Sequence, residues 1–213
     1  MIGLKINRNW LLITLIKRKF TQGPFGVLIW AYKGFRVPAP NFVKKKILRG
    51  VFIQDAVCVE TGTYLGETTC FLAKFSKNVI TIEPQRDLYN FTKRRLSKFE
   101  SIEFLHGTSE ELLPRIIEKI KENHKLNFWL DGHYSGGFTF QGVSNSPILS
   151  ELEWILPLTK DLVEVVIAID DFRDFNVGSS GYPSRTLLIS FAEKFGLSWD
   201  VQMDIFFMKK RIK

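Results

Sequence analysis

The segment AVCVETGTYLG, residues 56 to 66, carries the pattern on which the fold prediction rests. A β-branched, apolar run from residue 56 to 61 stops at Gly62, and residues 66 to 75 are compatible with a helix. A short apolar run that ends at a glycine is typical of a strand buried on both faces. The segment therefore predicts a strand, a glycine turn and a helix in direct succession.

The same pattern recurs along the chain. Further strand-like runs are NVITIE, IEFLHG, LNFWLDG and LVEVVIAIDD, which start at residues 78, 102, 126 and 162. Helical patterns follow at 84 to 98, from 109, at 147 to 158 and at 184 to 195, and SWDVQMDIFFMKK at 198 to 210 reads as two strands. Alternating strands and helices indicate a parallel sheet with helices on both faces. We predict an α/β fold, a doubly wound three-layer sandwich with a mostly parallel seven-stranded sheet and an antiparallel last strand.

The N-terminal quarter of the chain differs from the rest in charge. Residues 1 to 54 contain eleven Lys or Arg and no Asp or Glu, whereas the remainder is slightly acidic. Such asymmetry indicates an anionic partner for this quarter, or else a solvated basic helix without a partner. Residues 41 to 49 have a helical pattern, and VPAP at 37 to 40 interrupts any longer helix. We expect a basic helical extension over residues 1 to 50 and an α/β domain over residues 51 to 213.

The sequence predicts no signal peptide and no spanning helix. Its longest apolar stretch near the N-terminus, Trp10 to Ile16, is far shorter than the roughly 20 residues that a spanning helix needs. Lys17 to Lys19 stand where a small-residue cleavage site would be. Wound as a helix, residues 10 to 20 show no single clean apolar face. We expect a cytoplasmic protein whose residues 1 to 49 are able to contact an anionic membrane peripherally.

Acidic residues stand at the ends of four of the first five predicted strands. They are Glu60, Glu83, Asp131 and the pair Asp170 and Asp171. Ligands of open α/β sheets bind beyond the carboxyl ends of the strands. Because the fold itself needs no acids there, these residues predict a site.

The first turn indicates which kind of ligand that site binds. Tyr64 occupies the position at which a dinucleotide fingerprint needs its second glycine, so a pyrophosphate is disfavoured. Glu60, just before the turn, suits a cationic amine rather than a phosphate. Glu83, at the end of the second strand, suits ribose hydroxyls. A nucleoside that carries an amino acid and no phosphate meets both demands.

With these motifs in this order, the sequence resembles the class I S-adenosylmethionine-dependent methyltransferases over about residues 50 to 210. ETGTYLG at 60 to 66 is similar to the first motif of that family, Glu83 to its ribose-binding acid, and GTSEELL at 107 to 113 to the stretch beside the adenine. The resemblance implies S-adenosylmethionine as the cofactor. The residues that it implies for cofactor binding are Glu60, Gly62, Thr63, Tyr64, Gly66, Thr68, Glu83, Pro84, Thr108, Ser109 and Asp131.

Within that family, LDGHYSGG at 130 to 137 and AIDDF at 168 to 172 resemble metal-assisted O-methyltransferases of the macrocin type, which act on sugar or macrolide hydroxyls. This resemblance implies that Asp131, Asp170 and Asp171 hold Mg²⁺. It further implies that Asp131 and His133 are catalytic, with His133 as the general base, although close relatives often carry Asp at that position.

Strand geometry independently brings the same acids together. Neighbouring parallel strands lie roughly 4.8 Å apart, so the ends of the fourth and fifth strands share a small volume. Clustered carboxylates need a proton or a hard cation such as Mg²⁺ or Ca²⁺. The alternatives are that Asp171 caps the next turn, that Asp170 binds backbone amides and that His133 faces solvent.

The sequence favours an O-methyltransferase that acts on a hydroxyl of a glycosyl or other small-molecule acceptor, and an oligomer is compatible with it. An NAD-dependent or nucleotide-sugar oxidoreductase and a non-catalytic cofactor-binding module remain as alternatives. No nucleic acid partner is expected. The body of the chain is slightly acidic, and the Asn-Pro-Pro-aromatic signature of amino-group methylators is absent after the fourth strand.

Overall fold

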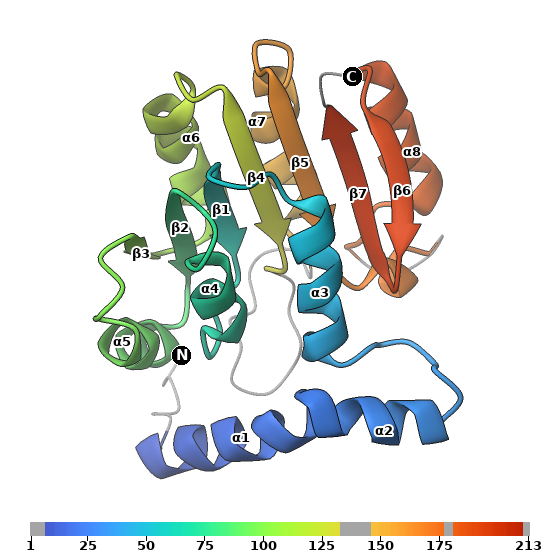
Figure 1. Ribbon diagram of the computed structural model, residues 1–213. Coiled ribbons are helices and arrows are strands. Elements are labelled where there is room, and N and C mark those ends of the chain that lie inside the picture. Colours follow the sequence, from blue (N-terminus) through green and yellow to red (C-terminus); the bar gives the residue numbers. More distant parts are fainter. Residues whose placement is uncertain (1–6, 133–145, 177–180, 211–213) are drawn as a thin grey trace.

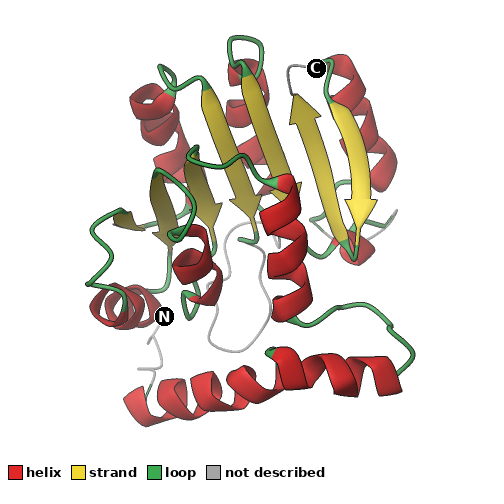
Figure 2. Ribbon diagram, in the orientation of Figure 1, coloured by secondary structure: helices red, strands yellow, loops and turns green. Residues whose placement is uncertain are grey.

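The computed structural model describes residues 7 to 132, 146 to 176 and 181 to 210. Its centre is a seven-stranded sheet in the order β3-β2-β1-β4-β5-β7-β6 (Figures 1 and 2). The strands are β1 (Val57–Thr61), β2 (Asn78–Glu83), β3 (Ile102–His106), β4 (Lys125–Leu130), β5 (Glu164–Ile169), β6 (Ser198–Gln202) and β7 (Ile205–Lys210).

The predicted topology is confirmed. The pairs among β1 to β5 are parallel, whereas β7 runs antiparallel to both β5 and β6. Met203 and Asp204, both at positive φ, form the tight turn that lets β7 fold back on β6. Strand order reverses between β1 and β4, which is where doubly wound sheets bind their ligands.

Helices cover both faces of this sheet. Those that follow the strands are α4 (Glu67–Leu72), α5 (Arg86–Arg95), α6 (Ser109–Ile120), α7 (Ile148–Leu158), the 3₁₀ helix η1 (Phe172–Asp174) and α8 (Arg185–Lys194). The helix expected from Pro84 begins instead at Arg86, because the Gln85 side chain accepts the first free amide hydrogens of α5 as its N-cap. Pro84 therefore belongs to the connection between β2 and α5.

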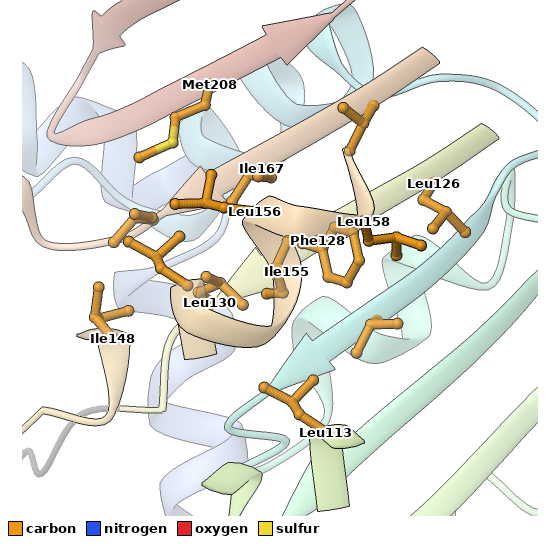
Figure 3. Packing of buried hydrophobic residues seen from close by; sticks show 14 of the residues in the cluster. Leu113, Leu126, Phe128, Leu130, Ile148, Ile155, Leu156, Leu158, Ile167 and Met208 are labelled. Atoms are coloured by element: carbon orange, nitrogen blue, oxygen red, sulfur yellow. The ribbon is translucent and has the colours of Figure 1, made fainter. Parts of the chain in front are cut away.

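Two apolar clusters, one on each face, form the core. On one face, side chains such as Phe128, Leu130 and Ile167 pack with residues of α6 and α7 (Figure 3). Leu188 and Ala192 of α8 belong to the same cluster. On the other face, Cys58 and Trp129 pack against α4 and a helix that precedes the sheet. Successive residues of a strand point to opposite faces, so continuously buried strands supply both clusters.

Three helices precede the sheet: α1 (Arg8–Thr21), α2 (Pro24–Tyr32) and α3 (Asn41–Val51). Leu48 of α3 is buried in the second core cluster, and residue 50, the expected end of the extension, lies in the last turn of α3. α1 and α2 lie across the end of the sheet toward which β1, β2, β4 and β5 run (Figure 1). Among the described residues, no helix is both long and apolar enough to cross a membrane.

The Asn127 side chain binds the backbone of the segment between α3 and β1. Its side chain is completely buried within β4, where Oδ1 accepts a hydrogen bond from the Ile53 amide at 3.0 Å and Nδ2 donates one to the Ile53 carbonyl at 2.8 Å. Both backbone groups of Ile53 are thereby satisfied. The short connection between α3 and β1 thus depends on one polar side chain in an apolar core.

Replacing this asparagine tests that dependence. We expect Asn127→Leu to lower the free energy of unfolding by about 2–4 kcal/mol, because the Ile53 N–H and C=O lose their partners in a buried place. Urea denaturation measures the change. Asn78→Leu, at the exposed start of β2, is the control and should change stability by less than about 0.5 kcal/mol. Equal effects of the two substitutions would contradict this role.

Candidate cofactor site and acidic cluster

The glycine turn after β1 lies against the end of β4. Gly62 has φ +86°, and a Cβ at this residue would lie 2.3 Å from the carbonyl oxygen of Asp131. Gly66 has φ +68° and precedes α4, where a Cβ would meet the Thr92 side chain at 2.4 Å. Because both close approaches and both backbone angles exclude a side chain, the G-x-x-x-G spacing is a steric requirement of this turn.

Glu60, at the end of β1, supports the glycine turn through hydrogen bonds with threonine hydroxyls. Its carboxylate is fully buried, and Oε2 accepts hydrogen bonds from Thr69 Oγ1 at 2.5 Å and Thr81 Oγ1 at 2.7 Å. Thr81 also shares a hydrogen bond of 2.6 Å with Thr63, a residue of the turn. Burial raises the pKa of Glu60 to about 7, although the two hydroxyl bonds oppose the rise. Oε1 has no hydrogen-bond partner among the described residues.

Glu83 holds the other side of the same turn. Its Oε2 accepts a hydrogen bond from the Tyr64 amide at 2.7 Å, and its Oε1 accepts one from the Gln85 amide at 2.9 Å. Burial raises the pKa of Glu83 to about 7, opposed by these two bonds. Tyr64 itself has φ +48°. The acid expected to bind ribose thus also fixes the turn, and each of its oxygens retains a lone pair for a further donor.

The start of α6 lies next to an acid that the sequence analysis missed. Thr108 caps α6 by accepting from the Glu111 amide at 3.4 Å, and Ser109 is buried. Glu151 of α7 is also fully buried. The hydroxyls of Ser109 and Thr61 lie close enough to lower its pKa, but neither of its oxygens has a well-formed hydrogen bond to the described residues.

A signal for Glu151 was present in the sequence. Ile148, Leu152 and Ile155 mark the buried face of α7, and residue 151 lies on that face at helical spacing. A lone acid in such a row is unusual, since carboxylates are almost never fully buried without a partner. Burial raises the pKa of Glu151 to about 7. It lies beside Gly132, because a Cβ on that glycine would be 3.4 Å from Glu151 Oε1.

The acids at the ends of β4 and β5 do come together. Asp131, Asp170 and Asp171 each offer an oxygen within 4.8 Å of the others. Asp171 precedes η1 at φ +55°, but its side chain does not cap that helix and instead accepts a hydrogen bond from Arg173 Nη1 at 2.7 Å. Arg173 also binds Asp204 in the turn between β6 and β7. His133 lies outside the described residues.

A lysine from α3 lies within this cluster. Lys44 Nζ is 2.6 Å from both carboxylate oxygens of Asp170 and 3.4 Å from Asp171 Oδ1. Burial alone would lower the pKa of Lys44, but the charges of Asp170, Asp171 and Asp131 outweigh it and raise the pKa. Lys44 is one of three consecutive lysines. Only its place four residues before Leu48, on the buried face of α3, distinguishes it in the sequence.

This lysine decides whether the cluster fits a metal ion. Three carboxylates are suitable ligands for Mg²⁺. However, the Lys44 ammonium already binds both carboxylate oxygens of Asp170, and the Arg173 guanidinium forms an ion pair with Asp171. The residues as they lie do not fit Mg²⁺, because the ion would have to take the place of Lys44.

A small polar cavity of about 70 Å³ separates the glycine turn from α3. Lys44, Thr68, Trp129 and Asp131 are among its lining residues, and the Trp129 indole N–H has no partner among the described residues. Arg18 of α1 closes one side of it. This volume is well below the roughly 300 Å³ of typical small-molecule pockets, so it matches only part of a nucleoside-sized ligand.

Two contacts hold Arg18 at the cavity. Its Nε donates to Glu67 Oε2 at 2.5 Å, and its guanidinium lies 5.4 Å from the centre of the Tyr64 ring. Through Arg18, the N-terminal helices are therefore in direct contact with the first turn and the start of α4.

Comparison with known proteins shows which solved structures have a similar fold. No family model matches the sequence, and no curated protein matches it. The chain is similar to a putative rRNA methylase from Clostridium thermocellum, with a TM-score of 0.50 and 13% identity over 80% of this chain and 96% of that one. It is similar to the methyltransferase domain of bacterial CtHen1-CN, with a TM-score of 0.50 and 12% identity over the same shares. An rRNA methylase from Streptococcus thermophilus matches at a TM-score of 0.48 and 17% identity, over 84% of this chain and 99% of that one. The chain therefore has the Rossmann-like fold found in methyltransferases.

A double-mutant cycle tests the ion pair in the cluster. Lys44→Met and Asp170→Asn should each lower the free energy of unfolding by about 3–5 kcal/mol, because each leaves buried charge unpaired. The double variant should lose at least about 1 kcal/mol less than the sum of the two. Urea denaturation gives all the values, and Lys46→Met on the exposed side of α3 is the control. Additive single effects would show that the two groups do not interact.

The raised pKa of Glu151 predicts a pH dependence of stability. Between about pH 4.5 and 7 the folded chain keeps a proton that the unfolded chain releases, so this group makes stability fall as the pH rises. Glu151→Gln removes that cost. Relative to the wild type, the free energy of unfolding of the variant should rise by up to about 3 kcal/mol from pH 4.5 to pH 8. Denaturation at both pH values checks this, with exposed Glu153→Gln as the control. A gain of the same size at both pH values would contradict a raised pKa.

Proposed function

We propose that the chain is an S-adenosylmethionine-dependent methyltransferase that transfers a methyl group to a hydroxyl of a glycosyl or other small-molecule acceptor. The observation that carries the proposal is the glycine turn, held by two buried acids beside a polar cavity at the switch point of the sheet. Two solved structures of the same fold are a putative rRNA methylase and a methyltransferase domain, which supports the choice of reaction.

The residues of the turn suit the two ends of this cofactor. The cavity beside Thr68 and Trp129 offers the Trp129 indole N–H, which has no partner among the described residues, to the amino-acid end. Glu83 lies at the end of β2, where the family resemblance expects the ribose, and its oxygens have lone pairs left for hydroxyl donors. Thr108 and Ser109 stand at the start of α6, where the family resemblance expects the adenine. When bound, the cofactor supplies a methyl group on a sulfonium sulfur.

The acidic cluster suits an acceptor hydroxyl. In the transfer, the acceptor oxygen forms a bond to the methyl carbon while the carbon–sulfur bond breaks, and the hydroxyl proton must pass to a base. Asp131, at the wall of the cavity, is the described residue placed to accept that proton, and His133 is the second candidate that the sequence offers. An ordered cleft of this kind accelerates the reaction largely by positioning the reactants.

In this proposal Lys44 supplies the positive charge that the sequence analysis assigned to Mg²⁺. An ammonium has three N–H donors. Two of them hold Asp170, and the third, whose contact with Asp171 Oδ1 is long at 3.4 Å, can turn to the acceptor oxygen as its negative charge develops. Asp170 and Asp171 then orient this ammonium. Mg²⁺ assistance stays the competing prediction, and it requires Lys44 to leave the cluster.

Calorimetry with S-adenosylmethionine and S-adenosylhomocysteine tests the cofactor assignment. We expect both to bind the wild type and Gly62→Ala to abolish binding, because the added Cβ would displace the turn from β4. Gly50→Ala is the matched control, since a Cβ there would meet no described atom within 4 Å apart from its chain neighbours and the backbone of its own helix. Thermal unfolding of both variants checks that they fold. Failure of both ligands to bind the wild type would refute the methyltransferase assignment.

Methyl transfer from labelled cofactor to a panel of glycosides tests the chemistry, with ribosomal RNA as a parallel acceptor. We expect transfer to a hydroxylated small molecule, retained after EDTA treatment, and a loss of kcat of about 100-fold in Lys44→Gln. Lys46→Gln should retain activity. Loss of activity in EDTA and its recovery with Mg²⁺ would exclude the role of Lys44 but leave the reaction class intact. Transfer to RNA alone would exclude the proposed acceptor.

A further inference from the structure

Exposed apolar side chains are concentrated on the N-terminal helices. Of the seventeen large hydrophobic residues that are exposed in the described chain, eleven lie between residues 10 and 37. These eleven are Trp10, Leu12, Ile13, Ile16, Phe20, Phe25, Leu28, Ile29, Tyr32, Phe35 and Val37. Scattered exposed hydrophobics are ordinary on a soluble domain, but such a concentration marks an interaction surface.

Helix α1 has two apolar faces. Leu11 is buried against Leu65 and Leu88, and Leu15 packs beside it, so this face fixes α1 to the domain. At 100° per residue, four of the five exposed apolar residues of α1 fall within an arc of about 100° on another face, and Trp10 lies outside it. The residues of that arc are Leu12, Ile13, Ile16 and Phe20. The two faces together explain why the sequence showed no single apolar stripe.

Helix α2 repeats the arrangement. Phe25, Leu28, Ile29 and Tyr32 are spaced as one helical face, and their exposed fractions are 65%, 69%, 49% and 93%. The opposite side of α2 carries the buried residues Gly26 and Trp30. Each helix therefore packs against the rest of the protein with one face and presents a second apolar face to solvent.

The charges around these faces all have one sign. Lys17 and Lys19 lie on the two edges of the exposed arc of α1, and Lys33 and Arg36 are exposed just after α2. No acidic residue occurs before Asp55. An apolar stripe flanked by lysines is the pattern of a helix that lies in a membrane interface, with its cations at the lipid phosphates.

We propose that α1 and α2 dock on the surface of an anionic phospholipid bilayer, with their exposed apolar arcs in the boundary between headgroups and acyl chains. This inference is independent of the reaction. A second copy of the chain fits the surface less well, because the basic residues around the two arcs would face one another without acids to pair them. Nucleic acid would leave the apolar arcs without a partner.

The surface lies at the functional end of the molecule. α1 and α2 run across the end of the sheet toward which β1, β2, β4 and β5 point (Figure 1). Arg18 of α1 lines the cavity and binds Glu67 of α4. Docking through these helices would bring the edge of the sheet that carries the acidic cluster close to the lipid headgroups.

Co-sedimentation of the full chain with vesicles tests the proposal. We expect binding to phosphatidylglycerol-containing vesicles and much weaker binding to pure phosphatidylcholine. The difference should shrink in 0.5 M salt, because the Debye length falls to about 4 Å and screening weakens the attraction. Replacing four exposed apolar residues should lower the partition coefficient more than tenfold. That variant is Ile16→Gln/Phe20→Gln/Phe25→Gln/Leu28→Gln.

Matched variants separate the two components. Lys17→Gln/Lys19→Gln/Lys33→Gln should weaken binding to anionic vesicles by about tenfold or more at low salt, whereas Lys74→Gln/Lys77→Gln/Arg94→Gln, elsewhere on the surface, should have little effect. The apolar control is Leu149→Gln/Trp154→Gln/Val201→Gln/Met203→Gln. Because all these side chains are exposed, unchanged thermal unfolding is the check on folding.

Three results would overturn the proposal. The first is a wild type that does not pellet with anionic vesicles. The second is an apolar variant that pellets as well as the wild type. The third is a wild-type dimer, seen by sedimentation velocity without lipid, that the apolar variant converts to a monomer while vesicle binding is absent in both. That last result would assign the surface to a second copy of the chain.

Discussion

The ion pair between Lys44 and Asp170 is the buried charge pair that joins the N-terminal helices to the sheet. It spans 126 positions of sequence and links α3 to the end of β5 in a nearly dry environment. Uncompensated, three neighbouring carboxylates would repel one another strongly. With one ammonium among them, the cluster can stay charged while α3 packs its apolar face on the sheet. The same contact places a cation where the proposed acceptor oxygen would bind, so one interaction serves both the fold and the proposed chemistry.

The glycine turn shows how the fold and the proposed cofactor site share their constraints. Gly62 must lack a side chain because the Asp131 carbonyl lies against it, and Asp131 in turn borders the acidic cluster. Glu60 and Glu83 are buried beneath the turn and hold it through hydroxyl and amide hydrogen bonds. A shift of this turn would therefore move both the proposed cofactor cavity and the end of β4. Rigid support of this kind is what a site that works by positioning requires.

The sequence was sufficient for the sheet and for the meeting of the acids. Buried strands are recognisable in the sequence as continuous apolar runs, and the carboxyl ends of parallel strands lie at one edge of the sheet. Asp131, Asp170 and Asp171 could therefore be placed together from the sequence alone. Lys44 and Glu151 could not be placed in the same way. Their roles depend on which helix face packs on which strand, and that is settled by contacts between distant segments rather than by local pattern. The two apolar faces of α1 were missed for the same reason, since only packing shows which of them the domain covers.

In our proposal Lys44, and not a divalent ion, neutralises the acidic cluster. Electron paramagnetic resonance of Mn²⁺ titrated into the wild type and Lys44→Met measures this directly, because Mn²⁺ takes the oxygen ligands that Mg²⁺ takes. We expect Mn²⁺ to stay free in the presence of the wild type, and a bound ion to appear only when the ammonium has been removed. A stoichiometric Mn²⁺ ion that binds to the wild type and is lost in Asp170→Asn would contradict this role of Lys44 and would assign the cluster to a metal.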